Sequence, residues 1–394
     1  MLSLLRSTPE IHIRNTMSKE LDDVIMDEWL TKVKEAEKIF DENKQILTPK
    51  IQRISHFLKQ NDRFAKYCTP KLISFGPIHY KDLHLKQGEE FKLLWTSNLV
   101  TEYSQKMKKD VKQVTKDLRK NIKDNIEELK ELFAEDALLE GGYDDNYFTW
   151  MLFVDGCSAL YFMENVDVHH PEALNIKLDQ LMYIARYMYL LENQLLMRLL
   201  RLLSESGEGN LNYSLVNFHS MGRSRGVQAL VMIPVIVLDA IHILDHSRSL
   251  LIGVPMEENT IPNQNDNLGN VIQNASDYQT SIYTYKNIRD LKEVGIGVKP
   301  CTTGENPLAW SNVHFLSNCL GGELMLPRIV FNDHTSYIFR NLIAYEMCPD
   351  NFRYKYECCS FFSFMDSLID SAEDVKELRL SSTLINMLGS EPIS

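Results

Sequence analysis

The chain has 394 residues, of which 44% are hydrophobic and 24% are charged, so it is long enough and apolar enough to form a large core. Its 42 basic and 54 acidic residues give a formal net charge of −12, which excludes the overall basic charge typical of nucleic-acid binding and general attraction to an anionic membrane. The seven cysteines are scattered, and charged residues interrupt the only early apolar run. We therefore expect no secretory signal and predict reduced, buried thiols.

The first strong pattern lies between Val100 and Phe133, where ten apolar residues are separated by nine steps over 33 positions, a mean spacing of 3.67. This spacing is close to the 3.6 residues of a helical turn and predicts one long amphipathic helix. Lysines and aspartates fill the other positions, so we expect a charged, solvated outer face. A lipid- or partner-binding stripe is the alternative.

Two segments that are apolar nearly throughout, Tyr147–Met163 and Leu178–Leu203, predict buried helices. The first contains Asp155 and the second contains the run Glu192–Gln194. A buried polar group without a partner costs about 1–3 kcal/mol, so we predict that these side chains join internal hydrogen-bond networks. Lining a binding cleft is the alternative. The second segment is long enough to cross a membrane but carries several charges, and no transmembrane span is predicted.

Polar stretches punctuate the second half of the chain. Ser204–Gly226 is rich in serine, glycine and asparagine, and predicts a loop. Gly253–Ser281 contains six asparagines and predicts a longer loop, which separates a helical body from a C-terminal module. Loops on a rigid scaffold commonly carry binding, so both are expected contact surfaces.

The C-terminal module is predicted to mix short helices and short strands. A helix at Ile288–Gly295 is expected to end at its glycine. Short strands are expected around Val313–Phe315 and Met325–Phe331. A capping box formed by Ser371 and Asp374 predicts the start of a last helix.

The stretch Leu324–Glu346 is the most informative part of the sequence. Asp333 is predicted to cap a helix by accepting a hydrogen bond from a free backbone N–H in its first turn. Arg340 and Glu346 would lie beside one face of that helix. The residues predicted on this face are Tyr337, Ile338, Asn341, Leu342 and Tyr345.

One motif predicts a catalytic serine. Gly222–Gly226 matches the G-x-S-x-G pattern of a hydrolase nucleophile elbow, in which a histidine deprotonates the serine, here Ser224. Asp245 and either His314 or His334 follow in a permissible order. The sequence lacks the alternating strands of an α/β sheet, so a flexible basic loop is the competing interpretation.

The remaining chemical motifs predict neither a metal nor a cofactor. His242 and His246 have a spacing that suits zinc, but Ile243 occupies the position of the metalloprotease glutamate and no third ligand is evident. We therefore predict that these histidines form a structural helix end. The phosphate-loop and dinucleotide-binding patterns are both absent from the sequence.

Several blocks, in order, resemble the plant domain-of-unknown-function 247 family, also called uncharacterised protein family 0481. Ile51–Leu58 resembles its first block, with Ser55 where the family usually has proline. Leu190–Gln194 matches its Leu-Leu-Glu-Asn-Gln core, although Leu195–Arg198 departs from the usual continuation. The other matching blocks are Tyr67–Tyr80, Met151–Cys157, Leu291–Ile296, Phe331–Thr335, Phe339–Glu346, Phe364–Asp370 and Asn386–Gly389.

The resemblance implies a mostly helical protein with no established catalytic mechanism. Members typically end in one transmembrane helix that anchors them at the plasma membrane, and members in grasses act as pollen-side determinants of self-incompatibility. This chain ends at Ser394, before the region of the anchor, so we expect a truncated form or a soluble, cytoplasmic one. The family-matched residues, most of which we expect to be structural, are Asp155, Glu192, Asn193, Gln194, Asp333, Arg340, Asn341 and Glu346.

We therefore predict a mainly α fold: a bundle-like helical body with a few short β-strands in the C-terminal module. The predicted organisation is a partly flexible segment over residues 1–46, one family domain over 47–390 and a tail over 391–394. Within the domain we expect the body at about 47–252, the polar loop at 253–281 and the module at 282–390. The predicted function is non-enzymatic recognition of a protein partner, in signalling or in self-incompatibility-type recognition. The alternatives are a serine hydrolase using Ser224 and a membrane-tethered scaffold in truncated form.

Overall fold

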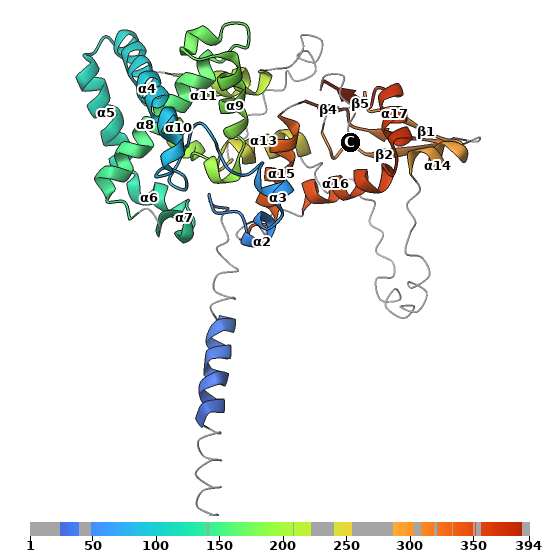
Figure 1. The fold of residues 1–394 in the computed structure, drawn as a ribbon. Helices are drawn as coiled ribbons and strands as arrows, with labels where there is room; N and C mark the ends of the chain where they lie inside the picture. The colour runs from blue at the N-terminus through green and yellow to red at the C-terminus, as the bar shows by residue number, and fades with distance from the viewer. Residues whose placement is uncertain are drawn as a thin grey trace, which may run out of the picture. The chain divides into compact units, whose positions relative to one another are not determined.

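The computed structural model divides the chain into two compact units, Met1–Thr48 and Pro49–Ser394. In the first unit, residues 24–38 form a helix. The second unit is mainly helical with a few short strands in its C-terminal part, which confirms the predicted fold class (Figure 1). The structure describes residues 24–38, 49–139, 142–207, 209–221, 240–253, 287–302, 309–318, 321–332, 334–349, 351 and 356–387.

The single helix predicted from Val100 to Phe133 is wrong, because the chain turns twice within it. Lys108 adopts the left-handed region with φ of 53°, which ends one helix, and the Asp110 side chain caps the next by accepting from the Lys112 N–H at 2.9 Å. A second break falls at Asn125. The elements of this part are α2 His56–Lys59, α3 Asp62–Ala65, η1 Leu83–Leu85, α4 Lys86–Met107, α5 Val111–Asp124, α6 Ile126–Glu131 and α7 Glu135–Leu139.

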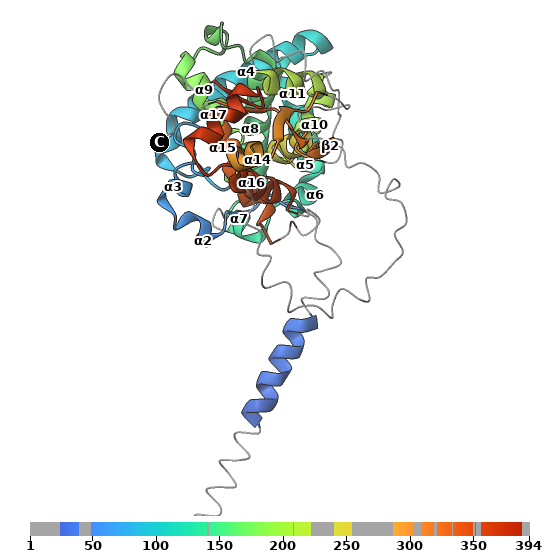
Figure 2. The ribbon, with the colours of Figure 1, turned by 90° about the vertical axis from the view of Figure 1, so that its right-hand side faces the viewer.

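The centre of the body is helix α8, Asp145–Asn165, which confirms the predicted core helix. Asp144 caps it by accepting from the Tyr147 N–H at 2.8 Å, and its side chains from Phe148 to Met163 are buried, except that of Trp150. Helices α4, α5, α10 and α11 all pack against it, and both views place α8 among them (Figure 2). A Cβ on Gly156 would collide with the Leu203 side chain, so glycine allows α10 to approach α8 closely.

The second predicted buried helix, Leu178–Leu203, is also broken. It consists of α9 Leu178–Tyr187, η3 Leu191–Asn193 and α10 Met197–Ser206. Asn193 donates to the Tyr187 carbonyl at 2.9 Å, and Gln194 donates to the carbonyls of Met188 and Leu190 at 2.8 and 2.7 Å. These side-chain amides replace backbone donors of a continuous helix, which is why the chain leaves the helix here.

The loop predicted over Ser204–Gly226 is partly wrong, because helix α11 occupies Leu211–Ser220. The Asn210 side chain caps this helix by accepting from the Tyr213 N–H at 3.1 Å, and Phe218 is buried against the core. The polar composition of this stretch therefore partly reflects the cap of helix α11, and it does not indicate a loop over the whole range. Residues 222–226, and all of the predicted loop 253–281 except Gly253, lie outside the described residues.

The C-terminal part contains small sheets and a second core. Strand β3 lies between β1, to which it is parallel, and β2, to which it is antiparallel, while β4 and β5 form a parallel pair. The Trp310 ring stacks on Phe361 with centroids 4.7 Å apart, beside Phe339 and Phe362. The elements are α13 Ile243–Ile252, α14 Ile288–Glu293, β1 Ile296–Pro300, β2 His314–Asn318, β3 Gly321–Leu326, β4 Ile329–Phe331, α15 Thr335–Glu346, α16 Glu357–Leu368, α17 Ala372–Leu380 and β5 Leu384–Asn386.

Several predictions for this part are confirmed, and some were missed. The helix before Gly295 exists as α14, with φ of 83° at the glycine, and Ser371 and Asp374 form the expected capping box of α17. The expected strand regions contain β2, β3 and β4, whereas β1 and β5 were not predicted. None of the helices in the described ranges combines the length and the apolar character that crossing a membrane requires.

Candidate functional site

Glu192 lies at the centre of a buried polar cluster. Its carboxylate accepts from the Ile54 N–H at 2.8 Å and from the Lys59 ammonium at 2.7 Å. His79 Nε2 lies 3.3 Å from the same carboxylate, and its Nδ1 lies 2.8 Å from Asp82. Burial alone would raise the pKa of Glu192, but hydrogen bonds from His79, Lys59 and the Ile54 amide outweigh it and hold the pKa below its ordinary value. The carboxylate is therefore charged and fixes the N-terminal block of the domain.

The two residues after Glu192 hold other distant segments. Asn193 Oδ1 accepts from the Phe75 N–H at 2.7 Å, and Gln194 Oε1 accepts from the Leu244 N–H at 3.0 Å. Gly76 has φ of 73°, and a Cβ there would lie 2.6 Å from the Gln194 carbonyl oxygen, so only glycine fits this approach. The run Glu192–Gln194 thus joins three parts of the chain through backbone N–H groups.

Asp155 forms a fully buried ion pair with Lys92. The Lys92 ammonium is 2.6 Å from Oδ1, and the Gly76 N–H donates to Oδ2 at 2.8 Å. Burial raises the pKa of Asp155 to about 6, because the Lys92 charge and the Gly76 hydrogen bond offset only part of the desolvation. Lys92 also lies 2.6 Å from Glu89. The pair ties α4 to α8 and to the segment around Gly76.

The C-terminal signature helix α15 carries the next group. Asn341 donates to the carbonyls of Tyr67 and Tyr337 at 2.8 Å each, and its Oδ1 accepts from the Leu191 N–H at 2.9 Å. All three hydrogen bonds go to backbone atoms, so Asn341 holds α15 against η3. Asp333, the predicted cap, lies outside the described residues. Instead, Asn332 Oδ1 accepts from the N–H groups just before and at the start of α15.

Glu346 ends this helix and caps another. Its two carboxylate oxygens accept from the N–H groups of Cys358 and Cys359 at 3.0 and 2.9 Å, in the first turn of α16. The Arg248 Nε donates to the same carboxylate at 2.9 Å, and Arg248 also pairs with Glu357. A carboxylate at a helix N-terminus is favourable because the free N–H groups and the helix dipole are positive there.

Among the candidate catalytic and metal-binding groups, Asp245, His242 and His246 are held in structural contacts, whereas His314 lies exposed on strand β2. Ser224 is one of the residues that the structure does not describe. His242 caps α13, its Nδ1 accepting from the Asp245 N–H at 3.1 Å, and His246 instead contacts His219 at 3.0 Å. Burial lowers the pKa of His246 to about 4, so the ring is neutral at physiological pH. Within the described part of the chain, no group of three histidine, cysteine or acidic side chains is placed to hold a metal ion.

The thiols are poor nucleophiles at neutral pH. Burial raises the pKa of Cys68 and of Cys359 to about 12, and it raises the pKa of Cys157 and Cys358 further. The thiolate, not the thiol, attacks electrophiles, so these four side chains act as packing groups.

A surface cluster of rings and cations lies where α9, α15 and the segment before Cys68 meet. The Arg340 guanidinium lies 4.3 Å from the centre of the Tyr67 ring, and the Lys66 ammonium lies 4.8 Å from it. Tyr67 and Tyr337 pack edge to face with centroids 4.9 Å apart. We call the whole cluster the tyrosine–cation surface; its members are Lys66, Tyr67, Tyr183, Arg186, Tyr337 and Arg340.

The third cation of this surface, Arg186, lies near one ring on α9 and one ring on α15. The Arg186 guanidinium lies 5.3 Å from the Tyr183 ring and 5.9 Å from the Tyr337 ring. Tyr183 is 43% exposed. Among the residues that the structure describes, no carboxylate forms an ion pair with Lys66 or with Arg340. Within the described ranges these two cations face aromatic rings and solvent, and Arg340 also donates to the Ser336 carbonyl at 3.4 Å.

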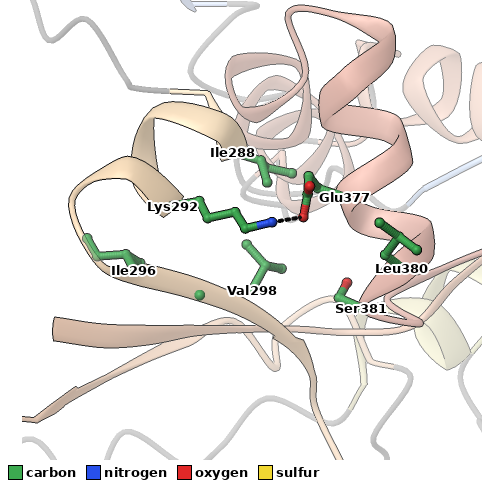
Figure 3. A pocket seen from close by; sticks show the side chains of 8 residues that line it. Ile288, Lys292, Ile296, Val298, Glu377, Leu380 and Ser381 are labelled. Carbon is green, nitrogen blue, oxygen red and sulfur yellow. Dashed lines mark hydrogen bonds and ion pairs between the residues drawn. The ribbon is translucent and has the colours of Figure 1, made fainter.

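A separate pocket of about 320 Å³ lies in the C-terminal part, between α14, β1 and the end of α17. Lys292 and Glu377 point toward each other across it (Figure 3) and form an ion pair of 2.7 Å. The other lining residues are Ile288, Ile296, Gly297, Val298, Leu380 and Ser381. The pocket thus combines apolar walls with one charged pair.

The fold and its sites define a mainly helical protein whose charged motif residues fix backbone segments. The family model for DUF247, plant protein of unknown function, matches residues 51–392, and the chain belongs to this family. A UPF0481 protein of Arabidopsis thaliana is 32% identical over 108 residues, which are 27% of this chain and 19% of that relative. The chain therefore matches only a small part of that relative's length. No solved structure matches.

The motif residues themselves could be found from the sequence, but their partners could not. Lys59, His79, Lys92 and Arg248 complete the buried clusters, and each partner carboxylate lies far away in the chain. Lys92 lies three residues after Glu89, a spacing that places both on one side of a helix, but this spacing does not indicate Asp155 as its partner. No pattern in the sequence indicated the pocket, because strand β1, which lines it, was not predicted.

Proposed function

We propose that this protein recognises a protein partner and does not turn over a substrate. Its setting would be signalling or self-incompatibility-type recognition in plant reproduction, as the family resemblance implies. The observation that carries the proposal is the tyrosine–cation surface. Tyrosine and arginine are the residue types, with tryptophan, that dominate the energetics of protein interfaces.

The geometry of this surface suits binding. Tyrosine offers a large, rigid, amphipathic contact area at a low cost in conformational entropy. Tyr183 is 43% exposed, and the rings of Tyr67 and Tyr337 are half-buried and held by edge-to-face packing. A partner would meet a surface that is already ordered, which lowers the cost of association.

The charge of the surface indicates the kind of partner. The chain has a net charge of −12, so three cations within one cluster are a local exception. An acidic segment of a protein would complement Lys66, Arg186 and Arg340 and would be steered toward them. We therefore assign an acidic protein segment as the partner of this surface.

The buried carboxylates support a non-enzymatic role. Asp155, Glu192 and Glu346 each accept backbone N–H groups and each contact a cation. Groups held in this way lack a free position from which to transfer a proton to a substrate. These contacts support a structural role for the family motifs.

The recognition proposal is tested by affinity purification of the tagged chain from plant reproductive and vegetative tissue. The variant Lys66→Glu/Tyr183→Ala reverses one charge and removes one exposed ring of the surface. Arg119→Glu/Trp150→Ala is the matched control, because it alters another exposed cation–ring pair, 5.8 Å apart, on α5 and α8. We expect a specific partner whose recovery falls about tenfold or more in the surface variant and is kept in the control. Equal recovery by both variants would contradict the assignment of this surface.

The non-enzymatic part of the proposal needs its own test, because Ser224 lies outside the described residues. The purified chain and its Ser224→Ala variant are treated with a fluorophosphonate probe that labels activated serines. We expect no labelling of the wild type above the Ser224→Ala background. Labelling that disappears in Ser224→Ala would establish an activated serine and overturn this part.

A further inference from the structure

The pocket at α14 and α17 lies beside an outer strand of the described sheet. Strand β1 is an outer strand of its sheet, whose order is β1-β3-β2. The Gly295 carbonyl accepts from the Gly322 N–H at 3.2 Å, and the Cys301 N–H donates to the Leu326 carbonyl at 2.7 Å. Odd-numbered residues of this segment therefore direct their backbone groups to β3. Even-numbered residues direct theirs to the outer edge, because the pattern alternates along a strand.

We propose that this edge and the pocket together bind an extended segment of a partner protein, which adds a strand to β1 and inserts one apolar side chain into the pocket. This inference rests on the proposed function, since it assumes a protein partner, and it assigns a second contact on a different surface. Strand addition is a recurrent mode of peptide recognition: backbone hydrogen bonds supply affinity and pockets for alternate side chains supply specificity.

The available backbone groups define a short site. The N–H and C=O groups of Ile296 and Val298 face outward, together with the C=O of Pro300. Pro300 has no N–H, and Lys299 carries a charge at this end, so both limit further pairing, as at many natural edge strands. No other strand in the described ranges pairs with this edge. The partner segment would make its backbone contacts over a few residues around Val298.

The pocket lies where an alternate side chain of an added strand would project. The side chains of Ile296 and Val298 point to the face that α14 and α17 cover, and the Lys292–Glu377 pair spans the pocket above Val298 (Figure 3). A volume of about 320 Å³ accommodates one large apolar side chain with room to spare. Polar neighbours of that residue would meet Lys292 or Glu377, both of which are partly exposed.

A partner segment fits this site better than a second copy of the chain. Self-pairing along β1 would engage a strand of five residues, whereas stable interfaces use about 20–30 residues on each side. An extended peptide needs neither a large area nor self-complementarity.

The test selects short random peptides, displayed on phage, on the purified full chain, and measures binding of the recovered peptides to variants. Leu380→Glu places a charge at the pocket, where the leucine is 69% exposed, so the fold is expected to tolerate it. Leu316→Glu is the matched control, an equally simple change of a 51% exposed leucine on the opposite outer strand β2. We expect Leu380→Glu to lower affinity about tenfold or more and Leu316→Glu to leave it unchanged.

Strand addition has a further readout that a simple surface contact lacks. N-methylation at alternate positions of a recovered peptide removes the N–H groups that would bond to β1, whereas methylation at the intervening positions does not. We expect strong loss of binding in one alternate set only, and slowed amide exchange at Ile296 and Val298 in the complex. Recovery of no peptide, or equal effects of both methylation sets, would overturn the inference.

The outcomes separate this inference from the proposed function. If binding of peptides or partners depends on Lys66 and Tyr183 but is unchanged by Leu380→Glu, the proposed site at β1 and the pocket is wrong. The recognition role is then retained. If peptides bind at β1 and the pocket, and the tyrosine–cation variant changes the binding of no partner, the strand-addition site is supported. The assignment of the tyrosine–cation surface is then contradicted. Failure of both variants to alter any binding would overturn both.

Discussion

The side-chain oxygen of Asn341 accepts a hydrogen bond from the backbone N–H of Leu191 at 2.9 Å. Through this bond the C-terminal helix α15 holds the break in the chain between α9 and α10. Two family motifs that lie 150 residues apart in sequence are thereby one structural unit. The same is true of Glu192 and Ile54, which lie 138 residues apart. The motif side chains therefore link distant backbone segments through hydrogen bonds.

Replacing Asn341 with alanine is expected to lower the free energy of unfolding by about 3 kcal/mol. The change leaves the Leu191 N–H and the carbonyls of Tyr67 and Tyr337 without their buried partner. Urea unfolding monitored by circular dichroism measures the loss. Asn212→Ala, at an exposed position of α11, is the control and should change stability little. If Asn341→Ala lowers the free energy of unfolding no more than Asn212→Ala does, the Asn341 hydrogen bonds do not stabilise the fold.

The pair of Arg248 and Glu346 predicts a non-additive result. Glu346→Ala removes one of the two carboxylates that contact the nearly buried Arg248 guanidinium, leaving Glu357, and it removes the cap of α16, so we expect a loss of about 3–5 kcal/mol. Adding Arg248→Met removes the buried charge that Glu346 no longer balances and should restore part of that stability. The measurement is a double-mutant cycle by chemical denaturation. Simple additivity of the two losses would contradict a direct coupling.

The Asp155 carboxyl predicts a specific pH dependence. Its pKa rises on folding from an ordinary 3.8 to about 6, chiefly through burial, so between these values the folded chain binds more proton than the unfolded chain. Stability contributed by this group is therefore present at low pH and is lost as the pH rises through about 6. The free energy of unfolding of the wild type minus that of Asp155→Asn should fall across this window. A difference that rises with pH would mean that Lys92 outweighs burial.

Part of this fold followed directly from the sequence. The segment around α8 is apolar on all sides, and only a buried helix accommodates that pattern. The capping box at Ser371 and the glycine after α14 are local signals, and both are present in the structure. Local chemistry acts over a few residues and can be recognised without tertiary contacts.

The breaks at Lys108 and after Tyr187 were not predictable in the same way. Apolar spacing continues across the first break because α4 and α5 pack on the same helix, α8. At the second, the amides of Asn193 and Gln194 replace helical hydrogen bonds, and this arrangement depends on the backbone N–H groups of Phe75 and Leu244, which donate to the same side chains from distant segments. Contacts of this kind are set by tertiary structure.

In the candidate sites, too, the sequence identified some of the residues but not their distant partners. The composition of the motifs identified Asp155 and Glu192 as buried polar groups, but not Lys92 and Lys59 as the cations beside them. The tyrosine–cation surface draws its residues from segments that are far apart in the sequence, and the pocket joins α14 to α17 in the same manner. Surfaces built from several elements leave no local pattern to detect.

The central claim is that the family motifs stabilise the fold while a separate surface binds the partner, and one paired measurement tests it directly. Thermal unfolding and partner recovery are measured for the wild type, for Glu192→Ala and for Lys66→Glu/Tyr183→Ala. We predict a lower melting temperature for Glu192→Ala, because Lys59 and the Ile54 N–H lose their buried partner. For the surface variant we predict an unchanged melting temperature and lost binding. A Glu192→Ala protein with the wild-type melting temperature and no partner binding would contradict the central claim.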